Sequence, residues 1–207
     1  GWAARRGRTL VVLSVDHGLR SEAGEEARSV VRRAAALGHS GDVLRWSPDR
    51  KGQDAARTAR HRLLAEAARA QGANLLLLGH TASDVEETLL MRLARPTRLA
   101  AAAGPQPVSV SPVWPEGLGL LIGRPLIGCK REDLRRFLVD ADEDWIDDPS
   151  NVSDAYERVR VRRLLAALGP GRLARIARDA VRLRAAEDLV LSAWLRRQIS
   201  VDDAGLI

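Results

Sequence analysis

Apolar residues in the first two-thirds of the chain follow two alternating spacings. Short continuous apolar runs are typical of strands buried on both faces, and they occur at residues 9–15, 42–46 and 74–79. Apolar residues that recur every three or four positions predict helices, and they occur at residues 21–37, 53–71 and 83–93. Gly38, Gly72 and Pro96 stand where these helices are expected to end.

This alternation predicts an α/β fold, a doubly wound parallel sheet with helices on both faces. Ligands of such sheets bind outside the carboxyl ends of the strands. Asp16, His17 and Gly18 follow the first predicted strand, and Gly79 and His80 follow the third. We therefore predict a binding site at this edge, where the two histidines could face each other. A purely structural role for each histidine is the alternative.

The last third of the chain has other patterns. Five prolines and two short apolar runs within residues 95–123 predict a loop and a hairpin. Beyond them we expect a short helix at 130–140, an acidic turn at 142–151, a basic helix and a long amphipathic helix.

The charge of the chain favours a polyanionic partner. The 33 basic residues exceed the 27 acidic ones, for a net charge of +6, and all but Lys51 and Lys130 are arginines. Such a surplus is typical of nucleic-acid binding, with a solvated basic surface as the alternative. Cys129 is the only cysteine, which excludes an intramolecular disulfide and is consistent with the cytoplasm. No apolar run approaches the roughly 20 residues of a membrane span, so we expect no membrane partner.

Two carboxylates mark the helix predicted at 83–93. Asp84 and Glu87 lie three residues apart and share a face in its first turn, for which Thr81 or Ser83 is available as the N-cap. The helix dipole alone favours carboxylates there. At the ligand edge of a sheet they could also hold Mg²⁺ or an ammonium group of a substrate. We expect Glu86 to be a solvated neighbour.

Arginines cluster at two further places. Arg57 and Arg60 lie three apart on the helix predicted at 53–71, where guanidinium groups could bind phosphate. A second cluster lies on the basic helix and could contact an RNA or triphosphate backbone: Arg158, Arg160, Arg162 and Arg163. For both clusters, a solvated helix face is the alternative.

Taken in chain order, these segments resemble one family. The motifs are VDHGLR, QDAARTARHRLL, LLLLGHTASDVEET, RPLIGCKREDL and DWIDDPSN, and the last is followed by the arginine-rich helix. From about residue 9 to residue 165 they resemble the tRNA(Ile)-lysidine synthetases, which are ATP-pyrophosphatases with a PP-loop. Each motif alone is modest, and their occurrence in one order makes the resemblance specific.

The resemblance implies a cytoplasmic, ATP-dependent ligase that modifies tRNA. It also implies a catalytic domain over residues 1–165, followed by a helical linker or the start of a C-terminal domain over residues 166–207. ATP activates the C2 oxygen of the wobble cytidine of tRNA(Ile) with a CAU anticodon, giving an adenylate and pyrophosphate. An amino group of free L-lysine then attacks C2, AMP leaves, and lysidine is formed. Mg²⁺ is the implied metal, and a homodimer is compatible with the resemblance.

The resemblance also implies roles for individual residues. Asp84 and Glu87 would bind lysine, and they would act in catalysis together with Arg57 and His80. Asp84 would also meet Mg²⁺. The implied ATP-binding residues are Asp16, His17, Gly18, Arg57, Arg60, Gly79, His80 and Arg158. The implied tRNA-binding residues are Arg158, Arg160, Arg162 and Arg163.

The sequence departs from the family pattern in several places. The phosphate loop Ser-Gly-Gly-x-Asp-Ser is missing, and it should follow a central first strand upstream of Leu10. Because losing that strand would leave unpaired sheet edges, we expect further chain upstream, with a degenerate homologue as the alternative. Ser83, Val85 and Val159 replace the usual Asp, Gln and Asn, and a Gly-Ser-Gly is missing between Arg95 and Leu99.

Two other functions stay open at this point. One is a related ATP-pyrophosphatase that thiolates tRNA, which the single cysteine disfavours because such enzymes typically carry several. The other is a catalytically inactive RNA-binding homologue.

Overall fold

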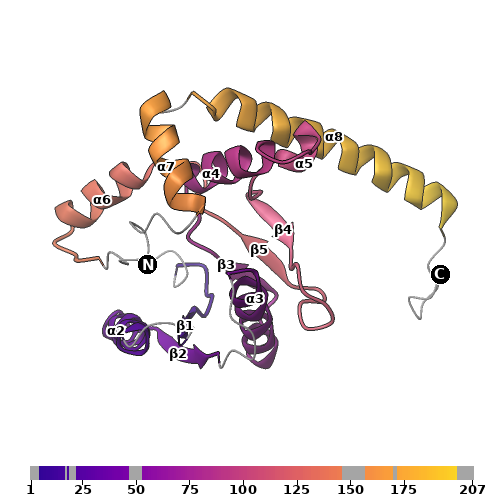
Figure 1. Cartoon of the computed structure of the whole chain (residues 1–207). Helices are drawn as coiled ribbons and strands as arrows, with labels where there is room; N and C mark the ends of the chain where they lie inside the picture. The colour runs from indigo at the N-terminus through magenta and orange to yellow at the C-terminus, as the bar shows by residue number, and fades with distance from the viewer. Residues whose placement is uncertain are drawn as a thin grey trace. The chain divides into compact units, whose positions relative to one another are not determined.

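The computed structural model describes residues 5–16, 18, 22–46, 53–145, 157–169 and 172–199. Its strands are β1 (Val11–Asp16), β2 (Ser40–Arg45), β3 (Leu75–Leu77), β4 (Val108–Val110) and β5 (Leu121–Gly123). Its helices are α2 (Ala23–Ala36), α3 (Gln53–Ala70), α4 (Ala82–Leu93), α5 (Leu99–Ala102), α6 (Arg131–Asp140), α7 (Glu157–Leu168) and α8 (Ala174–Gln198) (Figure 1). Every predicted strand and helix is present, and only the short α5 was not expected. The acidic turn lies partly outside the described residues.

Backbone contacts divide the chain into two compact units. The first comprises Gly1–Leu77 and Val108–Gly123, and the second comprises Leu78–Pro107 and Arg124–Ile207. The chain therefore passes between the units more than once. The predicted domain boundary near residue 165 stays a prediction, because this division groups residues by contact alone.

The first unit holds all the strands. β1 pairs with β2 in parallel, from Val11 opposite Ser40 to Asp16 opposite Arg45. β5 is central in a second sheet, parallel to β3 and antiparallel to β4. The parallel pairs and the β4–β5 hairpin confirm the predicted α/β architecture.

One continuous sheet was expected, and the described residues instead form two. β1 and β3 each keep one edge without a neighbouring strand within the described part of the chain. Helix α3 contacts both of these strands.

The two faces of the β3–β5–β4 sheet differ in burial. Ile122 of β5 is fully buried, and Leu76 of β3 packs beside Ala65 and Ala68 of α3. The residues next to Ile122 and Leu76 along their strands point to the opposite face, because side chains alternate along a strand. On that face Leu75, Val110 and Leu121 remain substantially exposed. Helix α3 therefore supplies the covered side of this sheet.

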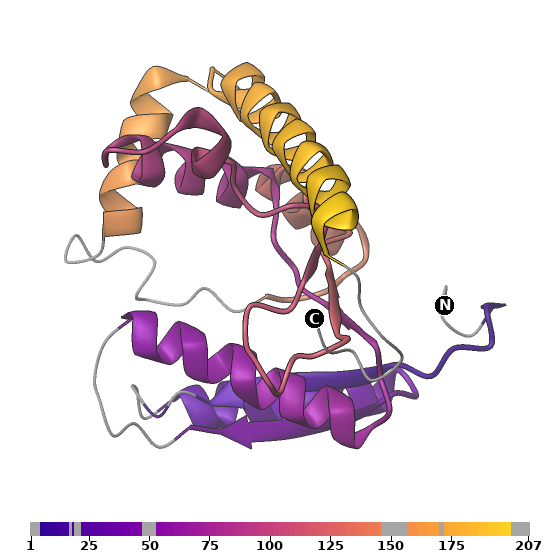
Figure 2. The same cartoon turned by 90° about the vertical axis from the view of Figure 1, so that its right-hand side faces the viewer.

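The core of the second unit is built largely from small residues. Leu89 of α4 packs with Ala102, Ala103, Ala177 and Ala180, which come from the α5 region and from α8. Small side chains let helices approach closely, and Figures 1 and 2 show α8 running beside α5 and α4. Within the described residues, no helix has the length and apolar character needed to cross a membrane.

Truncation of Ile122 tests the importance of the covered face. Ile122→Ala should lower the free energy of unfolding by about 2–5 kcal/mol, because it removes a fully buried side chain and leaves a cavity. Leu121→Ala is the matched control, since Leu121 is the next residue of β5 and is 44% exposed. Denaturant unfolding monitored by circular dichroism would measure both. Equal losses in the two variants would contradict the assignment of the faces.

Candidate active site at helix α4

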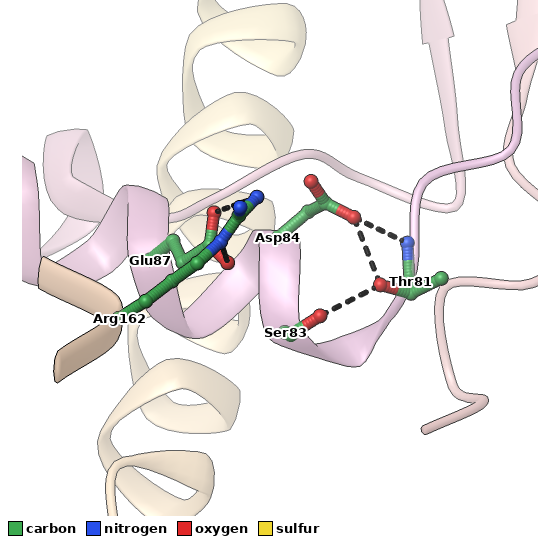
Figure 3. A network of polar contacts seen from close by, with 5 residues as sticks. All are labelled: Thr81, Ser83, Asp84, Glu87 and Arg162. Atoms are coloured by element: carbon green, nitrogen blue, oxygen red, sulfur yellow. Dashed lines mark hydrogen bonds and ion pairs between the residues drawn. The ribbon is translucent and has the colours of Figure 1, made fainter. Parts of the chain in front are cut away.

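The loop after β3 delivers a capped helix start. Thr81, one of the two predicted candidates, is the N-cap of α4 and is buried. Its backbone N–H and its hydroxyl both donate to Oδ2 of Asp84, each at 2.9 Å, and its hydroxyl also lies 2.9 Å from that of Ser83 (Figure 3). This capping box satisfies a backbone donor that the helix itself cannot. It also fixes the position of the Asp84 carboxylate.

Glu87 lies one turn further along α4 and is almost completely buried, at 1% exposure. Arg162 of α7 approaches it with two guanidinium nitrogens, Nε at 2.6 Å from Oε1 and Nη2 at 3.4 Å from Oε2 (Figure 3). A carboxylate at this depth is stable as an anion only if a cation accompanies it. The pair therefore ties α7 to α4.

The arginines of α7 divide between two environments. Arg162 is directed at Glu87 and is only 24% exposed, whereas Arg160 and Arg163 are exposed. Val159, which stands where the family usually has Asn, is buried. The side chain of Arg158 lies outside the described residues. Of the four predicted tRNA contacts, Arg160 and Arg163 are thus the ones seen on the surface.

The predicted residues of the first unit lie near the carboxyl end of β1 and on α3. Asp16 Oδ1 accepts a hydrogen bond from the Gly18 N–H at 2.9 Å, and Gly18 has a φ of +60°, a conformation that favours glycine. Arg57 is exposed and Arg60 is half-buried on α3. His17 lies outside the described residues.

Gly79 and His80 belong to the second unit, on the segment that leads from β3 to Thr81. Gly79 is exposed and His80 is half-buried. Within this unit the structure brings Asp84, Glu87 and Arg162 onto neighbouring positions. The other predicted site residues that the structure describes lie on the separate elements named above.

Sequence reasoning missed two contributions to this site. The partner of Glu87 lies 75 residues away in the chain, and helical spacing showed only which residues share a face with Arg162. The backbone carbonyl of Cys129 accepts the N–H of Ala82 at 3.0 Å, so the segment 124–129 supports the first turn of α4. The signal for this second contact was the RPLIGCKREDL motif, to which sequence reasoning gave no structural role.

Glu86 is half-buried, so the expectation of a solvated neighbour was wrong. Burial raises the pKa of its carboxyl above the usual 4.5, and the nearby Lys130 partly offsets this by lowering the pKa. The cause is tertiary, because Glu86 lies on a different face of α4 from Asp84 and Glu87, and residues from other segments of the second unit line a cavity together with that face.

A magnesium site would need ligands from a substrate. The described residues contain no group of three or more His, Cys, Asp or Glu side chains placed to hold a metal ion. Mg²⁺ often takes only one or two protein carboxylates, together with waters and phosphate oxygens. Asp84 fits a magnesium site with one protein carboxylate, in which waters and phosphate oxygens supply the other ligands.

Comparison with known proteins identifies the family of this chain and supports its fold. The family model described as the PP-loop domain matches residues 1–168. A tRNA(Ile)-lysidine synthase of Hyphomonas neptunium is 45% identical over 208 residues, covering 99% of this chain and 56% of that protein. One of Mesorhizobium japonicum is 39% identical over 204 residues, covering 96% and 45%. The chain thus spans about half the length of the curated relatives it matches.

A solved structure shares the fold. The U34-tRNA thiolase NcsA of Methanococcus maripaludis, determined with its 4Fe–4S cluster, superposes with a TM-score of 0.68. The superposition covers 86% of this chain and 63% of that one, at 15% sequence identity. Similarity at this level of identity supports the α/β architecture alone.

Removal of one partner of the buried ion pair should be costly. Arg162→Met leaves the Glu87 carboxylate buried without its cation and should lower the free energy of unfolding by about 3–5 kcal/mol. Arg95→Met is the control, because Arg95 pairs with Glu157 at 3.0 Å with side chains 68% and 37% exposed, and such surface pairs contribute about 1 kcal/mol or less. Adding Glu87→Gln to Arg162→Met should recover much of the loss. Denaturant unfolding measures all three variants, and equal effects for Arg162 and Arg95 would contradict the assigned burial.

The raised pKa of Glu86 predicts a pH-dependent stability. A carboxyl whose pKa is higher in the folded than in the unfolded protein contributes stability below its usual pKa of 4.5, and that contribution is lost as pH rises through the folded value. Glu86→Gln should therefore stabilise the protein at neutral pH relative to its effect below pH 4.5. Lys130→Ala should raise the pKa of Glu86 further, as NMR titration would show. A pKa at or below the usual value would contradict both expectations.

Proposed function

Because this chain belongs to the PP-loop domain family, we propose that the protein is a cytoplasmic ligase that joins lysine to the wobble cytidine of tRNA(Ile) with a CAU anticodon. Its curated relatives carry the name tRNA(Ile)-lysidine synthase. The observation that carries the proposal is the first turn of α4. There an arginine-rich chain keeps two carboxylates, Asp84 and Glu87, on one face and positions each through specific partners.

The reaction has two steps. The C2 oxygen of the cytidine attacks the α-phosphorus of ATP, so an O–P bond forms and pyrophosphate leaves with the electrons of the broken P–O bond. An amino group of lysine then attacks C2 and loses a proton, and AMP leaves with the former C2 oxygen. Both leaving groups are anionic, which is why cationic groups are needed beside them.

The lysine substrate brings the opposite charge. Arg162 pairs with Glu87, and we assign Asp84, on the same face of α4, to a lysine ammonium group. The Thr81 hydrogen bonds hold one oxygen of Asp84 in place, which favours binding without reorganisation. Glu87 and Arg162 then act as positioning residues for this face of α4.

The roles of the remaining residues follow from charge and position. We assign Arg57 and Arg60 to the phosphates of ATP, and the Asp16–Gly18 turn to the nucleotide, because ligands bind at the carboxyl ends of parallel strands. Mg²⁺ would neutralise phosphate charge when bound, with Asp84 as its protein carboxylate. Arg160 and Arg163 are exposed and are assigned to the tRNA backbone.

Lysine incorporation tests the proposal. The intact protein should transfer labelled lysine to tRNA(Ile) only when ATP is present, with release of pyrophosphate. Asp84→Asn should raise the KM for lysine about tenfold or more, because a contact with a charged partner contributes roughly 1.5–3 kcal/mol. Asn retains an acceptor for the Thr81 N–H, so the helix start should persist.

Asp133→Asn is the matched control, since Asp133 is an exposed carboxylate in the first turn of α6. It should leave the KM for lysine unchanged. An unaltered KM in the Asp84 variant would remove Asp84 from the lysine site. ATP-dependent sulfur transfer to tRNA without lysine incorporation would instead favour a thiolating enzyme, and RNA binding without turnover would favour an inactive homologue.

A further inference from the structure

A cavity of about 420 Å³ lies within the second unit, on the face of α4 that carries Ala82, Val85 and Glu86. Residues three and four positions apart share a helix face, and 100° of rotation per residue puts these three on a different side from Asp84 and Glu87. The cavity is therefore separate from the proposed lysine site. Its volume is in the range of small-molecule sites in proteins.

The walls of the cavity are mostly apolar. Val85 of α4 and Val181 of α8 face it together with Pro105, Pro107 and Ile127. Prolines and branched aliphatic side chains make flat, rigid, apolar surfaces. They would accept a planar apolar body without forming hydrogen bonds to it.

Three charged residues complete the lining and set its polarity. Arg178 and Arg182 lie one turn apart on α8 and are exposed, so they stand at the rim. Arg182 Nη1 is 3.9 Å from Oδ1 of Asp179, a long contact that leaves its side chain 81% exposed. On the α4 side the carboxylate of Glu86 is half-buried. Burial raises the pKa of this carboxyl, and the charge of the nearby Lys130 lowers it.

An occupant must therefore combine three properties. It needs a flat apolar body for the walls, a hydrogen-bond donor for Glu86, and negative charge for the two arginines. An unpaired nucleotide has all three, because RNA-binding proteins insert splayed bases between side chains and read their Watson–Crick edges. Carboxylates accept hydrogen bonds from exocyclic amino groups such as N4 of cytosine, and guanidinium groups match phosphate oxygens.

We propose that this cavity binds one unpaired nucleotide of RNA, with its base against the apolar walls, its amino group donating to Glu86, and its flanking phosphates on Arg178 and Arg182. The proposal rests on the proposed function only in taking RNA as the substrate. Because the cavity lies on a different face of α4 from Asp84, its occupant is a nucleotide other than the modified cytidine. The site therefore adds affinity and base selectivity outside the reacting centre.

The base preference follows from the chemistry of Glu86. Cytosine and adenine present an amino donor on the Watson–Crick edge, whereas uracil presents carbonyl oxygens on either side of a single N–H. A carboxylate acceptor should favour the first two, by about tenfold for one discriminating contact. An amide at the same position offers both a donor and an acceptor, so it should lose this preference.

Fluorescence anisotropy with labelled oligo(C), oligo(A) and oligo(U) RNAs tests the proposal on the intact protein. The unmodified protein should bind oligo(C) and oligo(A) about tenfold more tightly than oligo(U), and Glu86→Gln should bring the three affinities together. Arg178→Ala with Arg182→Ala should weaken binding of all three and flatten the salt dependence. Arg184→Ala with Arg197→Ala is the control, because it removes the same charge from the same helix away from the cavity lining.

Three results would overturn the proposal. The first is an equal affinity for the three RNAs in the unmodified protein, or a preference that Glu86→Gln leaves intact. The second is an arginine pair at the cavity that behaves like its control. The third is that the Arg178→Ala, Arg182→Ala variant keeps the RNA affinity of the unmodified protein but changes its sedimentation coefficient. That result would make the cavity an interface between protein chains.

The lysine assay separates this proposal from the proposed function. If lysine incorporation proceeds while substitution of Glu86 and of the two arginines leaves RNA affinity unchanged, only the nucleotide cavity is refuted. If the base preference depends on Glu86 while no lysine is incorporated, the cavity stands and the ligase function falls.

Discussion

The ion pair between Glu87 and Arg162 is the interaction on which the arrangement of the candidate site depends. A carboxylate with 1% exposure cannot keep its charge in the protein interior without a cation beside it. Arg162 satisfies that requirement from α7 and thereby holds α7 against α4. The same contact holds Glu87 on the face of α4 that also carries Asp84, the residue we assign to the lysine substrate.

Two faces of helix α4 carry candidate binding residues. One face carries Asp84 and Glu87, each fixed by a hydrogen bond or an ion pair. Another carries Ala82, Val85 and Glu86, which line the apolar cavity. The core of alanines lets α8 pack closely enough to bring Arg178 and Arg182 to that cavity. A chain poor in aromatic residues thus gains a binding surface from close helix packing.

The strands show a different constraint. Among the described residues β1 and β3 are edge strands of two separate sheets, and each has one edge without a neighbouring strand. Helix α3 contacts both strands, so the two sheets share a covering helix without sharing a ladder.

The order and type of the elements were already determined by the sequence, because strand and helix periodicity are local properties of a chain. The N-cap of α4 was determined only in part, because the sequence offered Thr81 and Ser83 and the structure selects Thr81. Tertiary structure alone decided which side chain meets Glu87, because helical spacing defines a face but not its partner. It also decided that Glu86 is half-buried, since the covering residues come from distant segments. Burial and pairing arise from contacts between elements, and no local pattern in the chain encodes them.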